Sequence, residues 1–541
     1  MPFEGAVCSN GAILYPVQTV RHTGECSLRK SLASLDGHDF DVAVIGAGVI
    51  GASAAQHLAA AGYDVLLVDE GDFASGSSSR STRLQHCGLR YLAPGKSMAE
   101  FFLHPSRLAT ALRMARQAMQ SRAQFVRTTP ERVRAMTVGF PIWRGGRYSP
   151  WQVNLAFRLL EKLGPKDVPL DYRRLRPAEA AADPLLRKLR DHERLIEVAQ
   201  FREYEFEWPE RIAVDAVLDA ARMGATVRNY TRCVGLAREG EGWRVRLQDA
   251  RAPAEQAEIG AKMLVNAAGI WIDRVNAQAG GGARRKITGT KGVHIMVRLP
   301  PECRDRGIAT LNRLDEGLYC VPWRGIHYFG PTETLYEGDI DDIQPEEEEI
   351  RFLLDEANHL LPSLRLTRQD VLFAWAGVRP LTYNPDLPMG NRSRELHDLG
   401  REGMPGALAM TAGPVMTHRG AGQEIAAAVR RRLAPSRAPQ PLSYAARRFP
   451  ENQNSPPLLD DYTDIKLADL RHAAANEQVT DLVDLLFRRV GAGWTAGMAA
   501  AEAERAAEAV ADIMDWDAAE RQAQVQRYHA YLARRHARRT A

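Results

Sequence analysis

The chain has 541 residues, of which 45% are hydrophobic and 26% are charged, a composition that excludes collagen-like, mainly disordered and small disulfide-bonded proteins. Its 71 Lys and Arg residues nearly balance 67 Asp and Glu residues, and the formal net charge of +4 argues against a dedicated nucleic-acid-binding protein. The six cysteines form no Cys-x-x-Cys pair and no Cys/His cluster, which predicts no metal site and reduced thiols in the cytoplasm.

Residues 1–38 are predicted to form an N-terminal extension, and they lack the basic start and apolar run of a signal peptide. The stretch from Val42 to Tyr63 contains no Asp, Glu, Lys or Arg and is long enough to span a bilayer as a helix. However, it contains three closely spaced glycines and few large aliphatic side chains after Ile50. We therefore expect a soluble cytoplasmic protein, with peripheral contact to the inner face of the membrane as the alternative.

Residues 39–69 have the pattern of a strand, a glycine turn, a helix and a second strand, which is a βαβ unit. Gly46, Gly48 and Gly51 fit the pattern G-x-G-x-x-G: the first makes a tight turn, the second lets a pyrophosphate approach, and the third lets the helix pack on the strand. Asp69 ends the second strand, where a carboxylate can accept a hydrogen bond from a ribose hydroxyl. The unit predicts dinucleotide binding; a glycine-rich turn without a ligand is the alternative.

Two further segments favour FAD over NAD as the dinucleotide. The serine-rich segment 76–83 follows the second strand, and its hydroxyls, including those of Ser78 and Ser81, could bind the pyrophosphate and ribityl chain. Segment 264–269 is a strand that ends in small residues, and Ala268 and Gly269 would let the backbone pass close to a ligand. For the first segment, a plain surface loop is the alternative.

The rest of the chain predicts two more structural units. Amphipathic segments follow at 98–119 and 153–163, short antiparallel strands at 227–269, more strands at 291–332, and a helix with glutamates in its first turn after Pro345. A proline-rich stretch then precedes a helix-rich tail. We expect a discontinuous FAD-binding domain at 39–95, 200–287 and 366–433, and a substrate domain at 96–199 and 288–365. A linker at 434–458 and a helical C-terminal domain at 459–541 would follow.

At the level of whole motifs, the chain resembles the FAD-dependent glycerol-3-phosphate dehydrogenases of the D-amino-acid-oxidase-like flavoprotein superfamily. The resemblance rests on GAGVIGASAAQHLAAAGYDVLLVDEGDFASGSSSRSTRLQHCGLRYL, LVNAAGIW, TKGVHIMV, YFGPTET, FAWAGVRPL and the tail, and covers about residues 38–535. It implies an α/β fold, in which a Rossmann-like FAD-binding domain is interleaved with an antiparallel β-sheet substrate domain and followed by an all-helical C-terminal domain. It also implies oxidation of sn-glycerol 3-phosphate to dihydroxyacetone phosphate by hydride transfer to flavin N5.

The resemblance also implies which residues meet the substrate. His86, Arg90, Tyr91 and Arg379 match family positions on the substrate side of the flavin. The arginines would bind the phosphate or the developing carbonyl oxygen, and His86 would transfer the hydroxyl proton. Weaker substrate assignments fall on Lys291, His294 and Thr332 at family-like positions, on Arg419, which the family shares, and on His418, which replaces an aromatic phenol of the family.

Segment 412–419 departs from the family. Where the family has a Gly-Gly-Lys-Leu-Thr-Thr-Tyr-Arg-like run, this chain keeps Gly413 and Thr417 as candidate flavin contacts but replaces the lysine by Pro414. The open alternatives are a compensating cation (Arg419, His418 or Lys291), another polyol phosphate or an amine as substrate, or an inactive flavin-binding module. The electron acceptor is expected to be a quinone or oxygen. The basic C-terminus and residues 430–432 suit anionic lipid or solvated helix ends equally.

Overall fold

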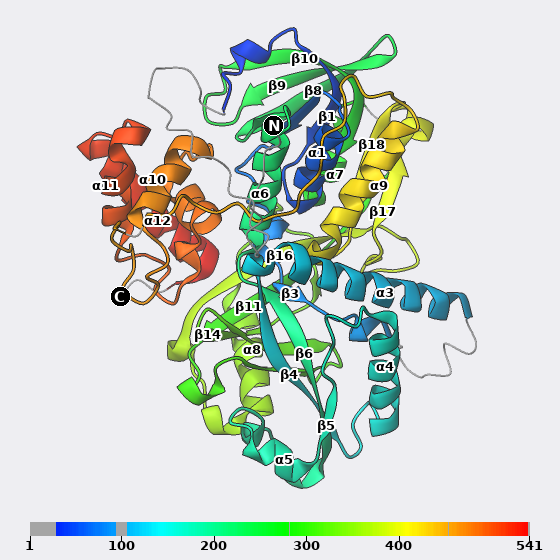
Figure 1. The fold of residues 1–541 in the computed structure, drawn as a ribbon, viewed down its shortest axis with the longest axis vertical. Helices are drawn as coiled ribbons and strands as arrows, with labels where there is room; N and C mark the ends of the chain where they lie inside the picture. The colour runs from blue at the N-terminus through cyan, green and yellow to red at the C-terminus, as the bar shows by residue number, and fades with distance from the viewer. Residues whose placement is uncertain (1–28, 93–104, 281, 453, 539–541) are drawn as a thin grey trace, which may run out of the picture.

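The computed structural model describes residues 29–92, 105–280, 282–452 and 454–538 (Figure 1). They form two β-sheets, helices packed on each sheet, and a group of C-terminal helices beside the junction of the two sheets. The predicted α/β class is therefore confirmed. The predicted extension at 1–38, the segment 98–104, and the cysteines Cys8 and Cys26 lie wholly or partly outside the described residues.

The eight-stranded sheet, which lies at the top of Figure 1 and is called the upper sheet here, has the order β17-β18-β10-β1-β2-β7. Its five strands from β18 to β7 run parallel. The short β-branched run of β1 is buried on both faces, as expected for a central parallel strand. The chain leaves β1 to form β2 on one side, and later places β10 on the other side. The carboxyl end of β1 is thus a topological switch point, where α/β sheets bind ligands. The bounds are β1 (Asp39–Ile45), β2 (Val65–Val68), β7 (Thr226–Arg228), β10 (Gln256–Asn266), β17 (Glu395–Asp398) and β18 (Ala407–Thr411).

Helix α1 (Val49–Ala60) packs on this sheet and is flanked by two other helices, α6 (Pro209–Arg222) and α9 (His418–Arg430). Its sequence is rich in alanine, and nearly all of its side chains are buried. Small side chains let both neighbours approach closely. The same core includes Val42 and Val44 of β1, so the helix that follows the glycine turn is held on three sides.

The predicted short strands at 227–269 form an antiparallel extension of the same sheet. β8 (Thr231–Glu239) pairs with β9 (Gly242–Asp249), and β9 pairs with β10. In β9, Trp243, Val245 and Leu247 are buried and alternate with more exposed residues, as the sequence predicted. The small helix α7 (Ile272–Ala277) follows β10.

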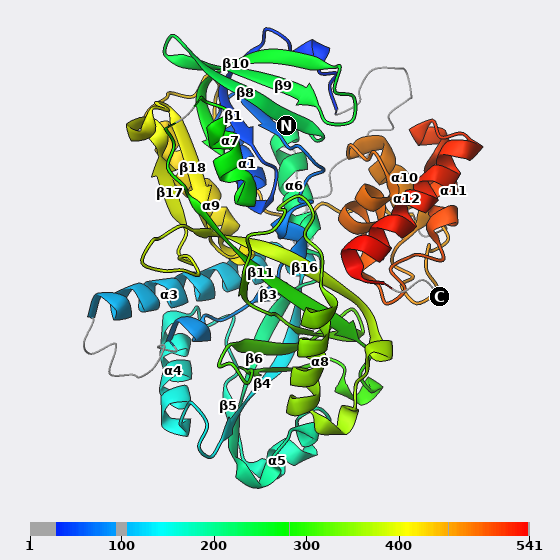
Figure 2. The ribbon, with the colours of Figure 1, turned by 180° about the vertical axis from the view of Figure 1, so that it is seen from behind.

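The lower, ten-stranded sheet is mainly antiparallel, with one parallel pair, β4 and β12. Its long strands β11 (Ile287–Val297) and β16 (Val371–Thr382) run beside each other at the junction with the upper sheet (Figure 2). The other strands are β3 (Leu84–Gln85), β4 (Val133–Trp143), β5 (Arg173–Leu175), β6 (Leu195–Phe206), β12 (Arg306–Leu311), β13 (Gly317–Trp323), β14 (Ile326–Gly330) and β15 (Thr334–Leu335). The helices of this half are α3 (Pro105–Thr128), α4 (Pro150–Leu163), α5 (Pro177–Ala182) and α8 (Glu347–Leu360).

Sheet membership divides the chain differently from the predicted domain boundaries. Residues 200–206 belong to β6 and residues 371–382 to β16, and both strands lie in the ten-stranded sheet. The sequence assigned both segments to the FAD-binding domain. Both strands run to the junction of the two sheets, where hydrophobicity alone gives no sign of which sheet a strand joins. We propose that the substrate domain includes them.

The C-terminal helices are α10 (Leu467–Asn476), a π-helical turn (Asp484–Arg489), α11 (Ala503–Met514) and α12 (Ala518–His536). In α11 the buried residues recur at helical spacing (Ala503, Ala506, Ala507 and Val510) and pack on the other helices. The preceding segment, predicted as a linker, contacts the upper sheet's helices: Tyr444 Oη lies 2.7 Å from His57 Nε2.

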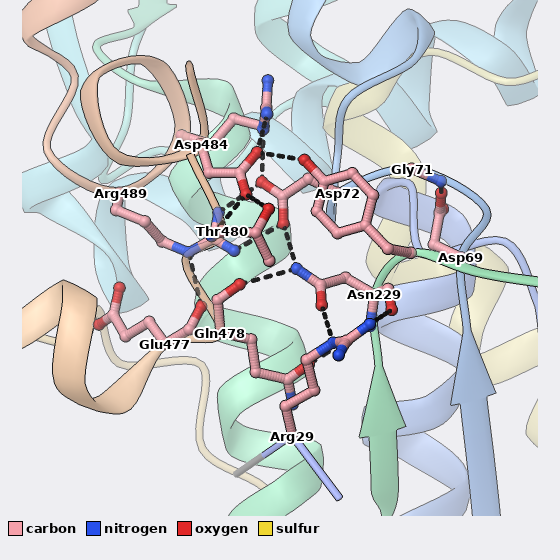
Figure 3. Close-up of polar contacts among 12 residues, drawn as sticks. Arg29, Asp69, Gly71, Asp72, Asn229, Glu477, Gln478, Thr480, Asp484 and Arg489 are labelled. Atoms are coloured by element: carbon pink, nitrogen blue, oxygen red, sulfur yellow. Dashed lines mark hydrogen bonds and ion pairs between the residues drawn. The ribbon is translucent and has the colours of Figure 1, made fainter. Parts of the chain in front are cut away.

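A buried ionic cluster ties these helices to the loop that follows β2 (Figure 3). Asp72 Oδ1 accepts from Arg489 Nη2 at 2.7 Å and from Asn229 Nδ2 at 2.9 Å, and its Oδ2 accepts from Arg489 Nη1 at 2.8 Å and from Arg488 Nε at 2.5 Å. Asp72 is fully buried, and the two guanidinium groups hold the pKa of its carboxyl far below the usual range despite the burial. Arg488 also pairs with Asp484.

We expect Asp72→Asn to lower the free energy of unfolding by about 3–5 kcal/mol, because it leaves two buried arginines without their shared counter-charge. Since the pKa of Asp72 is depressed, its contribution is present above pH ~4 and is lost as the pH falls below that value. Urea unfolding of both proteins at neutral and acid pH measures this. Asp512→Asn, which breaks an exposed pair with Arg471, is the matched control and should change little. Equal effects of the two substitutions would contradict the account.

Candidate functional site

A cavity of about 990 Å³ begins at the carboxyl ends of β1 and β10 and extends toward the ten-stranded sheet. Fourteen residues singled out in the sequence line it: Gly46, Gly48, Asp69, Ser78, Ser81, His86, Arg90, Tyr91, Ala268, Gly269, His294, Arg379, Gly413 and Pro414. The cavity therefore brings together residues from segments more than 300 positions apart. Its position at the switch point is the one that parallel sheets use for ligands.

The glycine turn places the N-terminus of α1 at the cavity wall. Gly46 has φ +99°, and a Cβ there would lie 2.7 Å from Ala267 O at the end of β10, so only glycine fits. Ser78 Oγ accepts a hydrogen bond from the backbone N–H of Val49 at 3.0 Å, which holds the serine-rich segment against the start of the helix. The positive end of the helix dipole at this point suits a pyrophosphate.

Gly51 does not line the cavity. A Cβ at this position would lie 1.7 Å from Gly46 O, so the third glycine lets the helix pack against the turn that precedes it. This is the packing role that the G-x-G-x-x-G pattern gives to its third glycine. Gly51 therefore shapes the turn from behind the cavity wall.

Asp69 lies at the end of β2 on the cavity wall, as predicted. Its Oδ2 accepts from the backbone N–H of Ala47 at 2.6 Å, and its Oδ1 accepts from that of Gly71 at 2.9 Å. Burial raises the pKa of the carboxyl to about 7, although both hydrogen bonds oppose that shift. With the helix N-terminus, the glycines and Ser78, this end of the cavity has the donor set that fits the adenosine and pyrophosphate of FAD.

The opposite end of the cavity is lined by arginines. Arg90 and Tyr91 come from a single 3₁₀ turn (Leu89–Leu92) beside α3, and Arg379 comes from β16. The guanidinium of Arg379 lies over Gly292, where a Cβ would be 2.5 Å from its Nη2. Burial, and secondarily the charge of Arg90, lowers the pKa of Arg379 to about 10, so it stays charged at neutral pH.

A third arginine, Arg392, lines the same end and was not predicted from the sequence. It lies in the loop after β16, one residue beyond Asn391, which pairs with Thr382 and so folds the loop back along the strand. Burial and the charge of Arg90 lower its pKa to about 10. Arg392 pairs with Glu333, and Tyr319 lies nearby on the wall. The only sequence feature that could have pointed to Arg392 is its place in a glycine- and proline-containing loop after the strand of Arg379.

Two histidines in the cavity wall are neutral at neutral pH. Burial, with Arg90 and then Arg392 adding to it, lowers the pKa of His86 to about 4. Burial also lowers the pKa of His294, whose ring stacks on Trp375 at 4.7 Å and whose Nε2 lies 3.1 Å from Thr82 Oγ1. In the described part of the chain, neither Nδ1 has a hydrogen-bond partner. Both rings are thus uncharged imidazoles at neutral pH.

The substrate assignments of Lys291 and Thr332 do not fit the structure. Successive side chains of β11 point to opposite faces, so His294 and Gly292 face the cavity whereas Lys291 faces α8, where it pairs with Glu349 at 2.7 Å. Thr332 Oγ1 accepts from the backbone N–H of Val293 at 2.9 Å. Both side chains therefore hold β11 and its neighbours together.

Three residues of segment 412–419 also point away from the cavity. His418 packs its ring 5.5 Å from Phe125, and burial lowers its pKa to about 3. Arg419 donates to Thr128 and Thr129, the last residue of α3 and the one after it, and lies 4.0 Å over Phe125. Thr417 Oγ1 donates to Pro414 O at 3.0 Å. None of these residues, nor Lys291, takes the place of the lysine that Pro414 replaces.

In the part of the chain that the structure describes, no helix is long and apolar enough to cross a membrane, and no group of three His, Cys, Asp or Glu side chains could hold a metal ion.

Comparisons with known proteins show which family the chain belongs to. A family model described as FAD dependent oxidoreductase matches residues 41–428. The glycerol-3-phosphate dehydrogenase of Synechocystis sp. is 30% identical over 416 residues, which are 74% of this chain and 72% of that protein. The aerobic glycerol-3-phosphate dehydrogenase of Staphylococcus aureus is 27% identical over 404 residues, 74% of this chain and 68% of that protein. The X-ray structure of the glycerol-3-phosphate dehydrogenase from Bacillus halodurans complexed with FAD has a TM-score of 0.69 at 20% identity, and covers 93% of this chain and 96% of that one.

We expect Gly51→Ala to lose most of its FAD on purification, because the new Cβ collides with backbone that cannot move aside and so distorts the turn. Overpacking of this kind costs about 1–3 kcal/mol or more. The ratio of visible flavin absorbance to protein measures retention. Gly497→Ala, where a Cβ would meet no atom within 4 Å, is the control. A Gly51→Ala protein with its full FAD content would show that the turn does not control binding.

Proposed function

Because this chain belongs to the FAD-dependent oxidoreductase family, we propose that it oxidises the C2 hydroxyl of sn-glycerol 3-phosphate to the ketone of dihydroxyacetone phosphate. The observation that carries the proposal is the group of three arginines, Arg90, Arg379 and Arg392, at the end of the cavity opposite the glycine turn. Relatives named glycerol-3-phosphate dehydrogenase support the same substrate.

The glycine turn, the N-terminus of α1, Ser78 and Asp69 would hold the adenosine and pyrophosphate of FAD. Ala268, Gly269 and Gly413 line the same cavity, and their small side chains would let the backbone approach the flat flavin ring. When bound, FAD accepts the two electrons of the oxidation as a hydride.

The three guanidinium groups compensate for the lysine that Pro414 replaces. One carboxylate, Glu333, pairs with Arg392, so the three arginines keep a surplus of positive charge beside the cavity. A phosphate dianion would satisfy this surplus with charge-assisted hydrogen bonds, and planar guanidinium groups can each bind two of its oxygens. Arg392 would thus supply the positive charge that the sequence lacks at position 414.

His86 is the group that we assign to the C2 hydroxyl proton. Its ring is neutral at neutral pH and can therefore accept a proton. Its low pKa results partly from the nearby arginines, and a bound phosphate dianion would offset those charges and raise the basicity of the ring. Substrate binding and base strength are therefore linked through the same arginines.

The positive charge of the three arginines distinguishes between the alternative substrates. Another polyol phosphate would satisfy the same three cations, so it stays compatible with this site. An amine substrate carries a positive charge at neutral pH and would be repelled by them. A module without catalysis would not need two neutral histidines beside an anion site.

The proposal includes a cytoplasmic location and a quinone or oxygen as electron acceptor. The basic C-terminal segment gives weaker support for membrane contact than its composition suggests. Arg534 and Arg535 both pair with Asp342, so part of the positive charge of the segment is neutralised within the protein.

Anaerobic addition of glycerol 3-phosphate should bleach the flavin of the purified protein, and Arg392→Ala should weaken the apparent affinity about ten- to a hundredfold. That range corresponds to the loss of one charge-assisted contact, about 1.5–3 kcal/mol. Arg401→Ala removes the same charge from an exposed position and should have little effect. Failure of glycerol 3-phosphate and of longer polyol phosphates to reduce an intact bound flavin would end the proposal.

We also expect the acid limb of kcat/KM to lie below pH 6.5, because the pKa of His86 is lowered. Removing a positive charge next to an imidazole raises its pKa, so Arg392→Ala should move this limb to higher pH. Stopped-flow flavin reduction across pH 4–8 measures it, with Arg401→Ala as control. An acid limb at the same pH in all three proteins would exclude His86 as the titrating group.

A further inference from the structure

A second cavity of about 450 Å³ adjoins the first on the substrate side. Five residues line both cavities: Leu84, His86, Arg90, Tyr319 and Glu333. They include the proposed base and one of the proposed phosphate ligands. The second cavity, which we call the side cavity, therefore opens beside the atoms of the substrate that would react.

Beyond this shared wall, the side cavity is mainly apolar. It lies between the faces of β4, β6 and β12, the 3₁₀ turn of Arg90, and helix α4. Its lining is mainly aliphatic and aromatic, for example Leu92, Met136, Val138, Val153, Phe201 and Ile308. Its volume lies within the range of small-molecule sites, which are lined in the same way.

Most charged groups around the side cavity have a polar partner within the protein. Arg147 and Asp315 lie 2.9 Å apart, and Glu316 Oε2 accepts from Asn312 Nδ2 at 3.1 Å. Glu203 Oε1 accepts from the backbone N–H of Cys87 at 2.7 Å. Burial raises the pKa of Glu203 to about 7, which reduces its charge further. Apart from the shared wall, the side cavity thus offers a ligand mainly apolar contacts, and its one cation, Arg147, is already paired with Asp315.

A ligand that fills both cavities has an anionic group at the arginines and an apolar group in the side cavity. In glycerol 3-phosphate the phosphate occupies C3 and the reacting hydroxyl occupies C2, so only the C1 oxygen can carry a substituent. We propose that the side cavity receives an apolar group on this oxygen, so that 1-O-alkyl glycerol 3-phosphates are substrates. This inference rests on the proposed function.

The reaction at C2 is unchanged by the substituent. The C2–H bond breaks and its electron pair leaves as a hydride to the flavin, the hydroxyl proton goes to His86, and C2 becomes a ketone carbon. The C1–O bond stays intact, and the product is a 1-O-alkyl dihydroxyacetone phosphate. FAD gains the two electrons that the substrate loses.

The test compares glycerol 3-phosphate with its 1-O-butyl ether in anaerobic flavin reduction. Each buried methylene is worth about fourfold in affinity, so partial burial of the butyl group should give the ether at least a tenfold lower half-saturating concentration. Ala156→Trp, which fills the side cavity from α4, should abolish this preference and leave glycerol 3-phosphate unaffected. Leu155→Trp on the exposed face of the same helix is the matched control.

Binding experiments with compounds that cannot be oxidised at C2 test this inference independently of the proposed function. 3-Hydroxypropyl phosphate and 3-butoxypropyl phosphate lack the C2 hydroxyl, so they cannot be oxidised there, and their binding is followed by perturbation of the flavin spectrum. Tighter binding of the butoxy compound to the wild-type protein, lost in Ala156→Trp, supports the side cavity even if glycerol 3-phosphate fails to reduce the flavin. Equal or weaker binding of the butoxy compound overturns the inference, even if glycerol 3-phosphate is oxidised.

Discussion

A single buried carboxylate, Asp72, joins the first βαβ unit to the C-terminal helices. It lies three residues after Asp69 on the cavity wall and accepts hydrogen bonds from two arginines more than 400 positions away. A charge without solvent is tolerated only when its partners are complete, so the loop after β2 and the π-helical turn depend on each other. Through this cluster, C-terminal helices that do not line the cavity help to fix the position of its glycine-turn end.

Arg83 plays a similar part at the point where the three structural units meet. Its buried guanidinium lies 4.3 Å from the ring of Trp323 in the lower sheet and 4.0 Å from that of Trp494 in the C-terminal region. It also pairs with Glu210 of α6 at 3.3 Å. Cation–π contacts gain strength when desolvated, so this junction holds the arginine end of the cavity in a fixed relation to the glycine turn.

The sequence predicted the elements whose signal is local. The glycine spacing, the β-branched strands and Asp69 identify the dinucleotide end, because each residue has its role within one βαβ unit. The substrate end was harder because its residues come from separate segments. Strand alternation could have excluded Lys291, since His294 lies three positions along β11 and faces the opposite side. Arg392 could not be found in this way: its place depends on a loop that folds back along β16. The pairing of Asp72 with Arg489 leaves no local pattern at all.

The proposed function depends on an anion site that Arg90, Arg379 and Arg392 would form beside a bound flavin. A crystal structure of the FAD-bound protein with 3-hydroxypropyl phosphate tests it most directly, because this analogue presents the phosphate and cannot react at C2. The account predicts phosphate oxygens within hydrogen-bond distance of all three guanidinium groups, with Pro414 making no polar contact. A phosphate bound elsewhere, with Arg392 still paired only to Glu333, would contradict it.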